Sequence, residues 1–404
     1  MSLCDASSET IHASTSQHPG FPRVALFALG GAYFVLGCAS LGAVGMVEEI
    51  QAGLGVSAAA VASLVTVFSV VYALTAPAAQ AVAGHLRRRA AIAGGLTAIA
   101  AGCVISAAAP SYTVLICARL LMGLGAAMTG PFLTAAAATL VAPEDRARAL
   151  ATVFAGVTAS SVLGVPLASF LAQTLGWRWA WGALALAAVI CAVVVWQLLP
   201  AANRGSRASI ATLTAVLRNR PLAMTVAACG TSVVGMFSTY ALIAVWLAEV
   251  GRLEASMIPP ALFMFGFGGI LGNALAARAV AALGARGAAL ACMCGSLVAM
   301  LALPYAAGWP TWAAIALMVF WAGAGMMVMV PVQSLLVALD PERAPLTLAL
   351  NSSAVYLGMA VGATVAGAVY EAFGPAVLPF GSAALILVAI GMLAVSGRRV
   401  VGRG

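Results

Sequence analysis

The sequence predicts an all-α integral membrane protein with twelve transmembrane helices, arranged as two pseudo-symmetric six-helix bundles with both termini in the cytoplasm. Three observations predict this fold class. Hydrophobic residues make up 63% of the 404 residues and charged residues only 7%, whereas a soluble domain carries about 25% charged residues. Apolar runs of spanning length recur along the chain, and the arginines between them fall almost entirely on one side. The composition excludes a soluble enzyme, a disordered chain and a disulfide scaffold.

Twelve apolar runs are each long enough to cross a bilayer, which takes about 20 helical residues. A helix satisfies its own backbone polar groups in lipid, so each run is expected to be helical. The runs cover 24–46, 58–83, 90–108, 111–140, 150–172, 179–199, 221–247, 257–277, 287–307, 311–338, 346–370 and 375–396. They divide into an amino-terminal bundle over 23–200 and a carboxy-terminal bundle over 221–397, joined by a cytoplasmic linker over 201–220. Residues 1–22, expected to be disordered, and 398–404 are predicted cytoplasmic tails.

The arginines decide the predicted orientation, because positive residues favour the cytoplasmic side. All nineteen basic residues are arginine, and sixteen lie inside when both termini are inside. Only Arg178 and Arg252 lie outside, while Arg119 lies within a span. Tryptophans agree, since amphipathic rings are enriched at membrane interfaces. Six of them cluster at the predicted outer boundary: Trp177, Trp179, Trp181, Trp246, Trp309 and Trp312. The net charge of +8 is therefore a topology signal, and we expect no nucleic-acid partner.

The two halves repeat the same landmarks. Gly123, Gly125 and Pro131 in the fourth run recur 200 residues later as Gly323, Gly325 and Pro331, and Gly164 and Gly176 recur 198 residues later as Gly362 and Gly374. A duplicated six-helix unit with parallel halves is a transporter architecture, with the substrate site between the halves near the middle of the membrane.

Four motifs carry a resemblance to a known family. They are Leu115–Gly125 around Arg119, Leu163–Pro166 with the following Gly176–Trp181, Phe265–Asn273, and Ala349–Ser353 with Gly358 and Gly362. On these motifs the chain resembles the major facilitator superfamily over residues 23–397. It is most similar to the twelve-helix drug:proton antiporter branch, near its arabinose-efflux and sugar-efflux permease-like members. The resemblance implies that superfamily's fold, export by alternating access, proton antiport, and a cavity lined by the first, fourth, seventh and tenth helices.

Charged residues depart from the family pattern in two places. The loop Gly84–Arg89 has no Asp, which places the family's cytoplasmic charge-relay gate in doubt. The first helix has Ala39-Ser40 where relatives carry an acid. Glu48 and Glu49, at its predicted outer end, are therefore the proton-coupling candidates, with Glu371 less favoured. Because no acid lies deep in the amino-terminal half, neutral or anionic substrates are expected to be carried better than dications.

Arg119 is the one charge inside a predicted span, and a charge at the bilayer centre costs about 2.5–3.5 kcal/mol. We expect it to face a cavity and to act on substrate. The alternative is a structural arginine that bonds backbone carbonyls of neighbouring helices. The other candidate cavity residues lie on helices that the resemblance places around the cavity: Tyr33, Ser40, Met122, Phe237, Tyr240 and Trp321. Asn351, on the eleventh helix, is a further candidate, for which a packing role is an equal alternative.

A second set of residues is expected to change conformation. Pro166 bends its helix because it lacks an N–H, and Gly164 lets another backbone approach closely. Relatives use this element as a hinge and seal between the halves; an ordinary packing kink is the alternative. The predicted gating residues are Gly84, Arg87, Arg88, Arg89, Gly164 and Pro166.

The sequence thus predicts a secondary active transporter of the bacterial inner membrane that exports small organic molecules. Its expected partners are a small-molecule substrate, the lipid bilayer and protons, and it is expected to be a monomer. We expect no catalytic residue, metal or cofactor, since no Walker-type sequence is present and no His lies in a predicted span. A facilitator or differently coupled exporter is the alternative, and a non-transporting membrane receptor or scaffold is a second one.

Overall fold

Long apolar helices build the protein. A computed structural model describes residues 22–83, 86–142, 145–200, 219–341 and 344–396, and these residues contain no strand. The amino-terminal half contains α1 (Arg23–Leu41), η1 (Gly42–Met46), α2 (Val47–Leu54), α3 (Ala58–Ala83), α4 (Arg88–Ala107), α5 (Tyr112–Thr139), α6 (Arg146–Ala159), η3 (Ser160–Gly164), α7 (Val165–Leu175) and α8 (Trp177–Leu198). The carboxy-terminal half contains α10 (Arg220–Tyr240), α11 (Ile243–Glu249), η4 (Ala255–Met257), α12 (Ile258–Ala302), η5 (Leu303–Gly308), α13 (Thr311–Met327), α14 (Met329–Leu339), α15 (Ala344–Phe373), η6 (Pro375–Val377) and α16 (Leu378–Ser396).

The described residues contain 11 helical segments that are long and apolar enough to span a membrane. One of them, Ala255–Ala306, has 52 residues, which at 1.5 Å per residue is far longer than a bilayer is thick. Its helix α12 is interrupted at Gly284, where φ is 70° and ψ is 162°. It therefore supplies two of the predicted spans, the eighth and ninth, which brings the helices into agreement with the twelve predicted runs. The side of the membrane on which the termini lie stays a prediction.

The repeated glycines have the same conformation in both halves. Gly176 has a φ of 94° and Gly374 a φ of 79°, and each stands directly before the last span of its half. A residue with a Cβ rarely adopts this backbone conformation, so glycine is required at both turns. The repeat read from the sequence is thus a repeat of backbone geometry.

Four of the spans are not continuous α-helices. The first breaks into a 3₁₀ turn at Gly42–Met46, and the fifth contains a π-helical turn at Ser160–Gly164. The seventh breaks after Tyr240, and the tenth breaks at Val328. Broken helices are tolerated at membrane depth where they are buried in protein or line a cavity, and substrate sites are commonly built at them.

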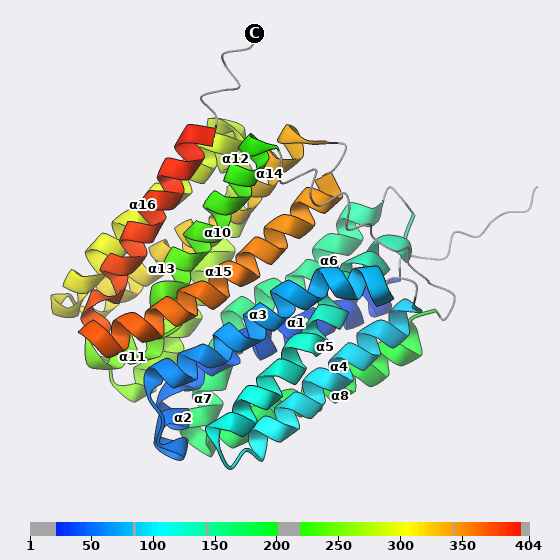
Figure 1. The fold of residues 1–404 in the computed structure, drawn as a ribbon, viewed down its shortest axis with the longest axis horizontal. Coiled ribbons are helices and arrows are strands. Elements are labelled where there is room, and N and C mark those ends of the chain that lie inside the picture. The colour runs from blue at the N-terminus through cyan, green and yellow to red at the C-terminus, as the bar shows by residue number, and fades with distance from the viewer. Residues whose placement is uncertain (1–21, 84–85, 143–144, 201–218, 342–343, 397–404) are drawn as a thin grey trace, which may run out of the picture.

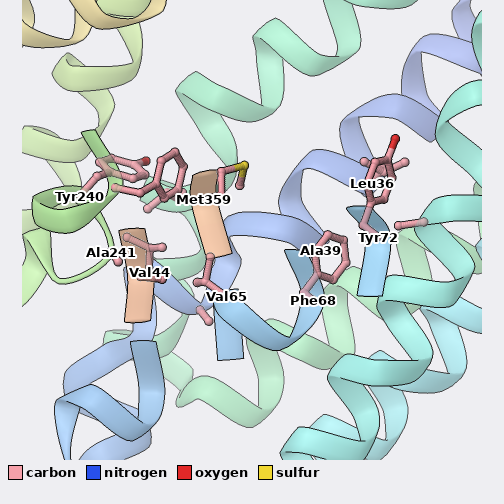
Figure 2. Packing of buried hydrophobic residues seen from close by; sticks show 14 of the residues in the cluster. Leu36, Ala39, Val44, Val65, Phe68, Tyr72, Tyr240, Ala241 and Met359 are labelled. Atoms are coloured by element: carbon pink, nitrogen blue, oxygen red, sulfur yellow. The ribbon is translucent and has the colours of Figure 1, made fainter. Parts of the chain in front are cut away.

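The halves meet along α3 and α15, which lie side by side between the two groups of helices (Figure 1). A second seam joins α12 to α7 and η3, and a third joins α2 and η1 to α11. We call the end of the bundle that holds α2 and α11 the α2–α11 end; it is the predicted outer end. Figure 2 shows part of the packing between the halves, with Val44 beside Ala241 and Met359 above Val65.

The outer surface is apolar, as a lipid-facing surface must be. Helix α8 alone leaves large hydrophobic side chains exposed, among them Leu186 at 63% and Ile190 at 53%. A soluble protein rarely exposes such a continuous patch, so the folded chain requires lipid as its solvent.

Candidate functional site

Arg119 of α5 is 1% exposed and lies between α1, α3 and α8 of the amino-terminal half. Its Nε donates a hydrogen bond to the Leu64 carbonyl (3.1 Å), and its terminal nitrogens donate to the carbonyls of Ala39 (2.5 Å) and Ser40 (3.2 Å). The guanidinium also lies over two aromatic rings, with its Cζ 5.4 Å from the Phe68 ring centre and 5.2 Å from that of Trp181. These partners are backbone carbonyls and aromatic rings of neighbouring helices, as the alternative of a structural arginine predicts.

These contacts explain why the first span can break. The carbonyls of Ala39 and Ser40 belong to the last turn of α1, where a helix leaves its final carbonyls without intrahelical partners. A positive group at that end satisfies the carbonyls and the helix dipole together. Arg119 therefore caps α1 at the entry to the 3₁₀ turn, and the role in substrate binding that the sequence predicts stays a prediction.

In the carboxy-terminal half, the predicted cavity residues form an aromatic cluster. The Tyr240 ring centre lies 5.5 Å from that of Phe237 and 6.5 Å from that of Trp321. The Phe265 ring centre lies 4.9 Å from that of Tyr240 and 4.8 Å from that of Trp321. Tyr240 is 3% exposed and Trp321 is fully buried. The sequence analysis found three of these four rings and missed Phe265, although it stands in a quoted motif.

The remaining cavity candidates differ in how deeply they are buried and in whether they lie beside Arg119. Tyr33 is half-buried and packs on Phe154 with ring centres 5.7 Å apart. Met122 is fully buried, and its sulfur lies 3.6 Å from the Arg119 guanidinium. Ser40 Oγ and Asn351 Oδ1 are buried polar atoms without a hydrogen-bond partner among the described residues. The structure therefore brings Ser40, Met122 and Arg119 together and leaves Tyr33 partly accessible.

Carboxylates from both halves gather at the α2–α11 end. Glu48 and Glu49, the predicted coupling residues, are half-buried in the first turn of α2, and Glu48 interacts electrostatically with Glu249 of α11. Glu249 in turn accepts a hydrogen bond from the Tyr370 hydroxyl (3.1 Å). The Ser57 hydroxyl of the amino-terminal half donates to Glu371 Oε1 of the other half (3.1 Å). Glu249 was missed because its partners lie in distant parts of the sequence.

The fifth-span element lies on a seam between the halves. A Cβ added at Gly164 would lie 2.9 Å from the Cys38 sulfur, so the glycine allows this close contact with α1. Pro166 follows the π-helical turn and lines an open apolar groove of ≈ 410 Å³. The groove runs between α7 and α12, and its lining residues are Leu163, Pro166, Leu167, Phe170, Pro259, Pro260, Phe263 and Met264.

The predicted cytoplasmic gate is described only in part, since Gly84 lies outside the described residues. Arg88 donates to the Ala135 carbonyl and to Thr139 Oγ1, both on α5. The guanidinium of Arg89 lies 4.8 Å from the Trp196 ring centre. These partners belong to the same half, so the contacts described for Arg88 and Arg89 stiffen that half. Arg87 is exposed, and a gating role for these residues stays a prediction.

The comparisons with known proteins agree with this architecture. Residues 29–343 match the family model described as Major Facilitator Superfamily. The chain belongs to this superfamily. It is 30% identical to the inner membrane transport protein YdhP of Escherichia coli K12 over 93% of this chain and 96% of the relative. Members of the superfamily are transporters and not enzymes.

Two further likenesses extend over most of the chain. A probable sugar efflux transporter of Pasteurella multocida is 27% identical over 88% of this chain and 87% of its own. A crystal structure of a bacterial homologue of the human lysosomal transporter Spinster, described as inward-facing and unoccupied, is 16% identical and superposes with a TM-score of 0.73 over 94% of this chain and 96% of its own. At that identity the structure supports the fold alone.

Proposed function

We propose that this membrane transporter exports small organic molecules across a bacterial inner membrane by alternating access and exchanges them for protons. The observation that carries the proposal is the uneven contact between its repeated halves. Hydrogen bonds and a ring contact join Ser57, directly before α3, and Thr66 and Tyr72 of α3 to Glu371, Ala360, Thr364 and Tyr356 of α15, from the α2–α11 end to the middle of the two helices. Two halves that join along the part of the seam nearest one end are what alternating access requires.

Two further observations support the direction and the substrate class. The relatives include a protein named as a probable sugar efflux transporter. The carboxylates placed by the structure, Glu48, Glu49 and Glu249, lie at the α2–α11 end rather than around Arg119. A strongly cationic substrate therefore has no described counter-ion beside Arg119, which favours neutral or anionic amphiphiles.

The test is an efflux screen followed by reconstitution. Cells that express the protein are challenged with a diverse panel of drugs and metabolites, and each exported compound is measured again in proteoliposomes with an imposed pH gradient. Export that stops when the gradient collapses supports antiport. Downhill flux that ignores the gradient identifies the alternative, a facilitator, and absence of flux for every compound identifies a receptor or scaffold.

Orientation is tested separately. Reporter fusions after Arg204 and after Gly404 are both expected to read cytoplasmic, because sixteen arginines lie on that side in the predicted topology. A periplasmic signal from either fusion contradicts the topology and would leave the transport results intact.

A further inference from the structure

Two tyrosines that the sequence analysis did not single out meet across the boundary between the halves. Tyr72 of α3 and Tyr356 of α15 have ring centres 3.9 Å apart and planes inclined by 29°, so the rings are stacked. Their hydroxyl groups also interact with each other. One ring comes from each half, and this pair therefore separates whenever α3 and α15 move apart.

A third tyrosine joins the pair. Tyr33 of α1 interacts electrostatically with both Tyr72 and Tyr356. A Cβ at Gly130 of α5 would lie 2.7 Å from the Tyr72 hydroxyl, so the glycine leaves room for that group. Figure 2 shows Tyr72 beside Leu36 of α1. Three tyrosines from three helices and both halves thus interact with one another.

The position of this cluster in the molecule is distinctive. The stacked pair lies further from the α2–α11 end than the hydrogen bonds of Ser57 and Thr66 to α15. Tyr72 and Tyr356 are also near the midpoints of their helices, Ala58–Ala83 and Ala344–Phe373. The cluster therefore lies at mid-membrane depth, on the boundary between the halves.

We propose that Tyr33, Tyr72 and Tyr356 form a substrate-binding site for an uncharged molecule with a flat aromatic ring and hydrogen-bonding groups. When the halves part along α3 and α15, both stacked rings lose their partner, and an aromatic ring of the substrate replaces it. The three phenolic hydroxyls both donate and accept, so they bind neutral hydroxyl, carbonyl or amide groups. When the tyrosines stack on each other again, they occupy the space that the substrate ring held and release it. This inference rests on the proposed transport function and names its substrate class.

The test uses matched aromatic and saturated probes. Binding of phenyl and cyclohexyl β-D-glucopyranoside, and of benzamide and cyclohexanecarboxamide, is measured on the full-length protein in detergent. Loss of an aromatic pair changes affinity about two- to tenfold. We therefore expect at least one phenyl probe to bind about two- to tenfold more tightly than its cyclohexyl analogue. Tyr356→Leu should remove that preference, and Tyr356→Phe should keep the preference while weakening both members of the pair.

The matched control is Tyr305→Leu, which removes a tyrosine that is 68% exposed and lies outside the cluster. Thermal unfolding confirms that each variant is folded, and Tyr72→Leu replaces Tyr356→Leu if the latter is not. Equal binding of both analogues, no binding of either phenyl probe, or equal effects of Tyr356→Leu and Tyr305→Leu overturns the site. Because export is measured separately in the efflux screen, a wild-type protein that exports compounds without aromatic preference refutes this inference alone. A protein that exports nothing refutes the proposed function.

Discussion

The Arg119 guanidinium donates a hydrogen bond to the Ala39 carbonyl at 2.5 Å, and this contact ties the first half of α5 to the last turn of α1. The arginine thereby fixes the place where the first span stops being an α-helix. A buried cation with carbonyl partners can hold a helix break open without having a carboxylate beside it.

Arg119→Ala is expected to abolish transport and also to lower the thermal unfolding temperature. The variant leaves buried carbonyls unsatisfied, at about 1–3 kcal/mol each. Arg119→Lys should recover little, because an ammonium cannot reproduce the planar five-donor group that reaches three carbonyls at once. The measurement is transport rate beside thermal unfolding. Arg178→Ala is the matched control, since Arg178 donates a single described hydrogen bond, to the Ala109 carbonyl at 3.0 Å. Wild-type transport in Arg119→Ala would show that the cap on α1 is dispensable.

Gly156→Ala should destabilise the protein by about 1–3 kcal/mol, the usual range for overpacking. A Cβ at Gly156 would collide with the backbone carbonyl of Gly30, and a backbone atom cannot move aside as a side chain can. Gly182→Ala in α8 is the control, because a Cβ there meets nothing within 4 Å. Thermal unfolding in detergent separates the two variants. If they unfold at the same temperature, α1 and α6 do not pack as closely as the structure shows.

Glu48→Gln and Glu49→Gln are expected to separate coupling from binding. One of the two should lose proton-driven transport and keep substrate affinity, since Gln has the same shape and does not titrate. Substrate uptake and proton release are measured in proteoliposomes. Glu254→Gln, which changes an exposed acid at the start of η4, is the control. Unchanged proton coupling in both variants would move the proton site to another group, with Glu249 the next to be replaced.

The pair Thr66→Cys/Thr364→Cys should form a disulfide that stops transport, and reduction should restore it. The native hydroxyl oxygens, which each lie one bond from Cβ as a cysteine sulfur does, are 3.1 Å apart and belong to different halves, so a covalent link holds the two halves together on the side of the α2–α11 end. The control is Thr239→Cys/Ser382→Cys, whose native hydroxyls lie 2.7 Å apart within one half. That second link should leave transport running. Full transport with the first pair oxidised would contradict alternating access at this end.

The sequence was sufficient for the spans and for the glycine landmarks, because both depend on local chemistry. An apolar run of spanning length must be helical in lipid, and the positive φ of Gly176 and Gly374 requires glycine wherever it occurs. The break after Tyr240 could not be predicted, since Tyr240-Ala241-Leu242 contains neither glycine nor proline and the apolar run continues through it. Tertiary packing, not local propensity, bends that helix.

The sites were predicted less completely than the spans. Arg119 was found because a charge in an apolar run is visible in any sequence, but its carbonyl partners were not, since every residue has a carbonyl. Tyr72 and Tyr356 were missed because a single sequence does not reveal which distant helices touch. Tyr33 was found through its position on the predicted inner face of the first helix.

The cap on the first span has a consequence for how the two copies of the repeated unit have diverged. At the offset that relates the halves, Arg119 corresponds to Val319, which cannot cap carbonyls. One copy therefore has its break pinned by a cation, whereas the break of the other copy, after Tyr240, lies beside stacked aromatic rings and the Thr239–Ser382 hydroxyl pair. Rings slide over one another more easily than three directed hydrogen bonds exchange partners. If the halves move as proposed, we expect the carboxy-terminal copy to bend more than the amino-terminal copy.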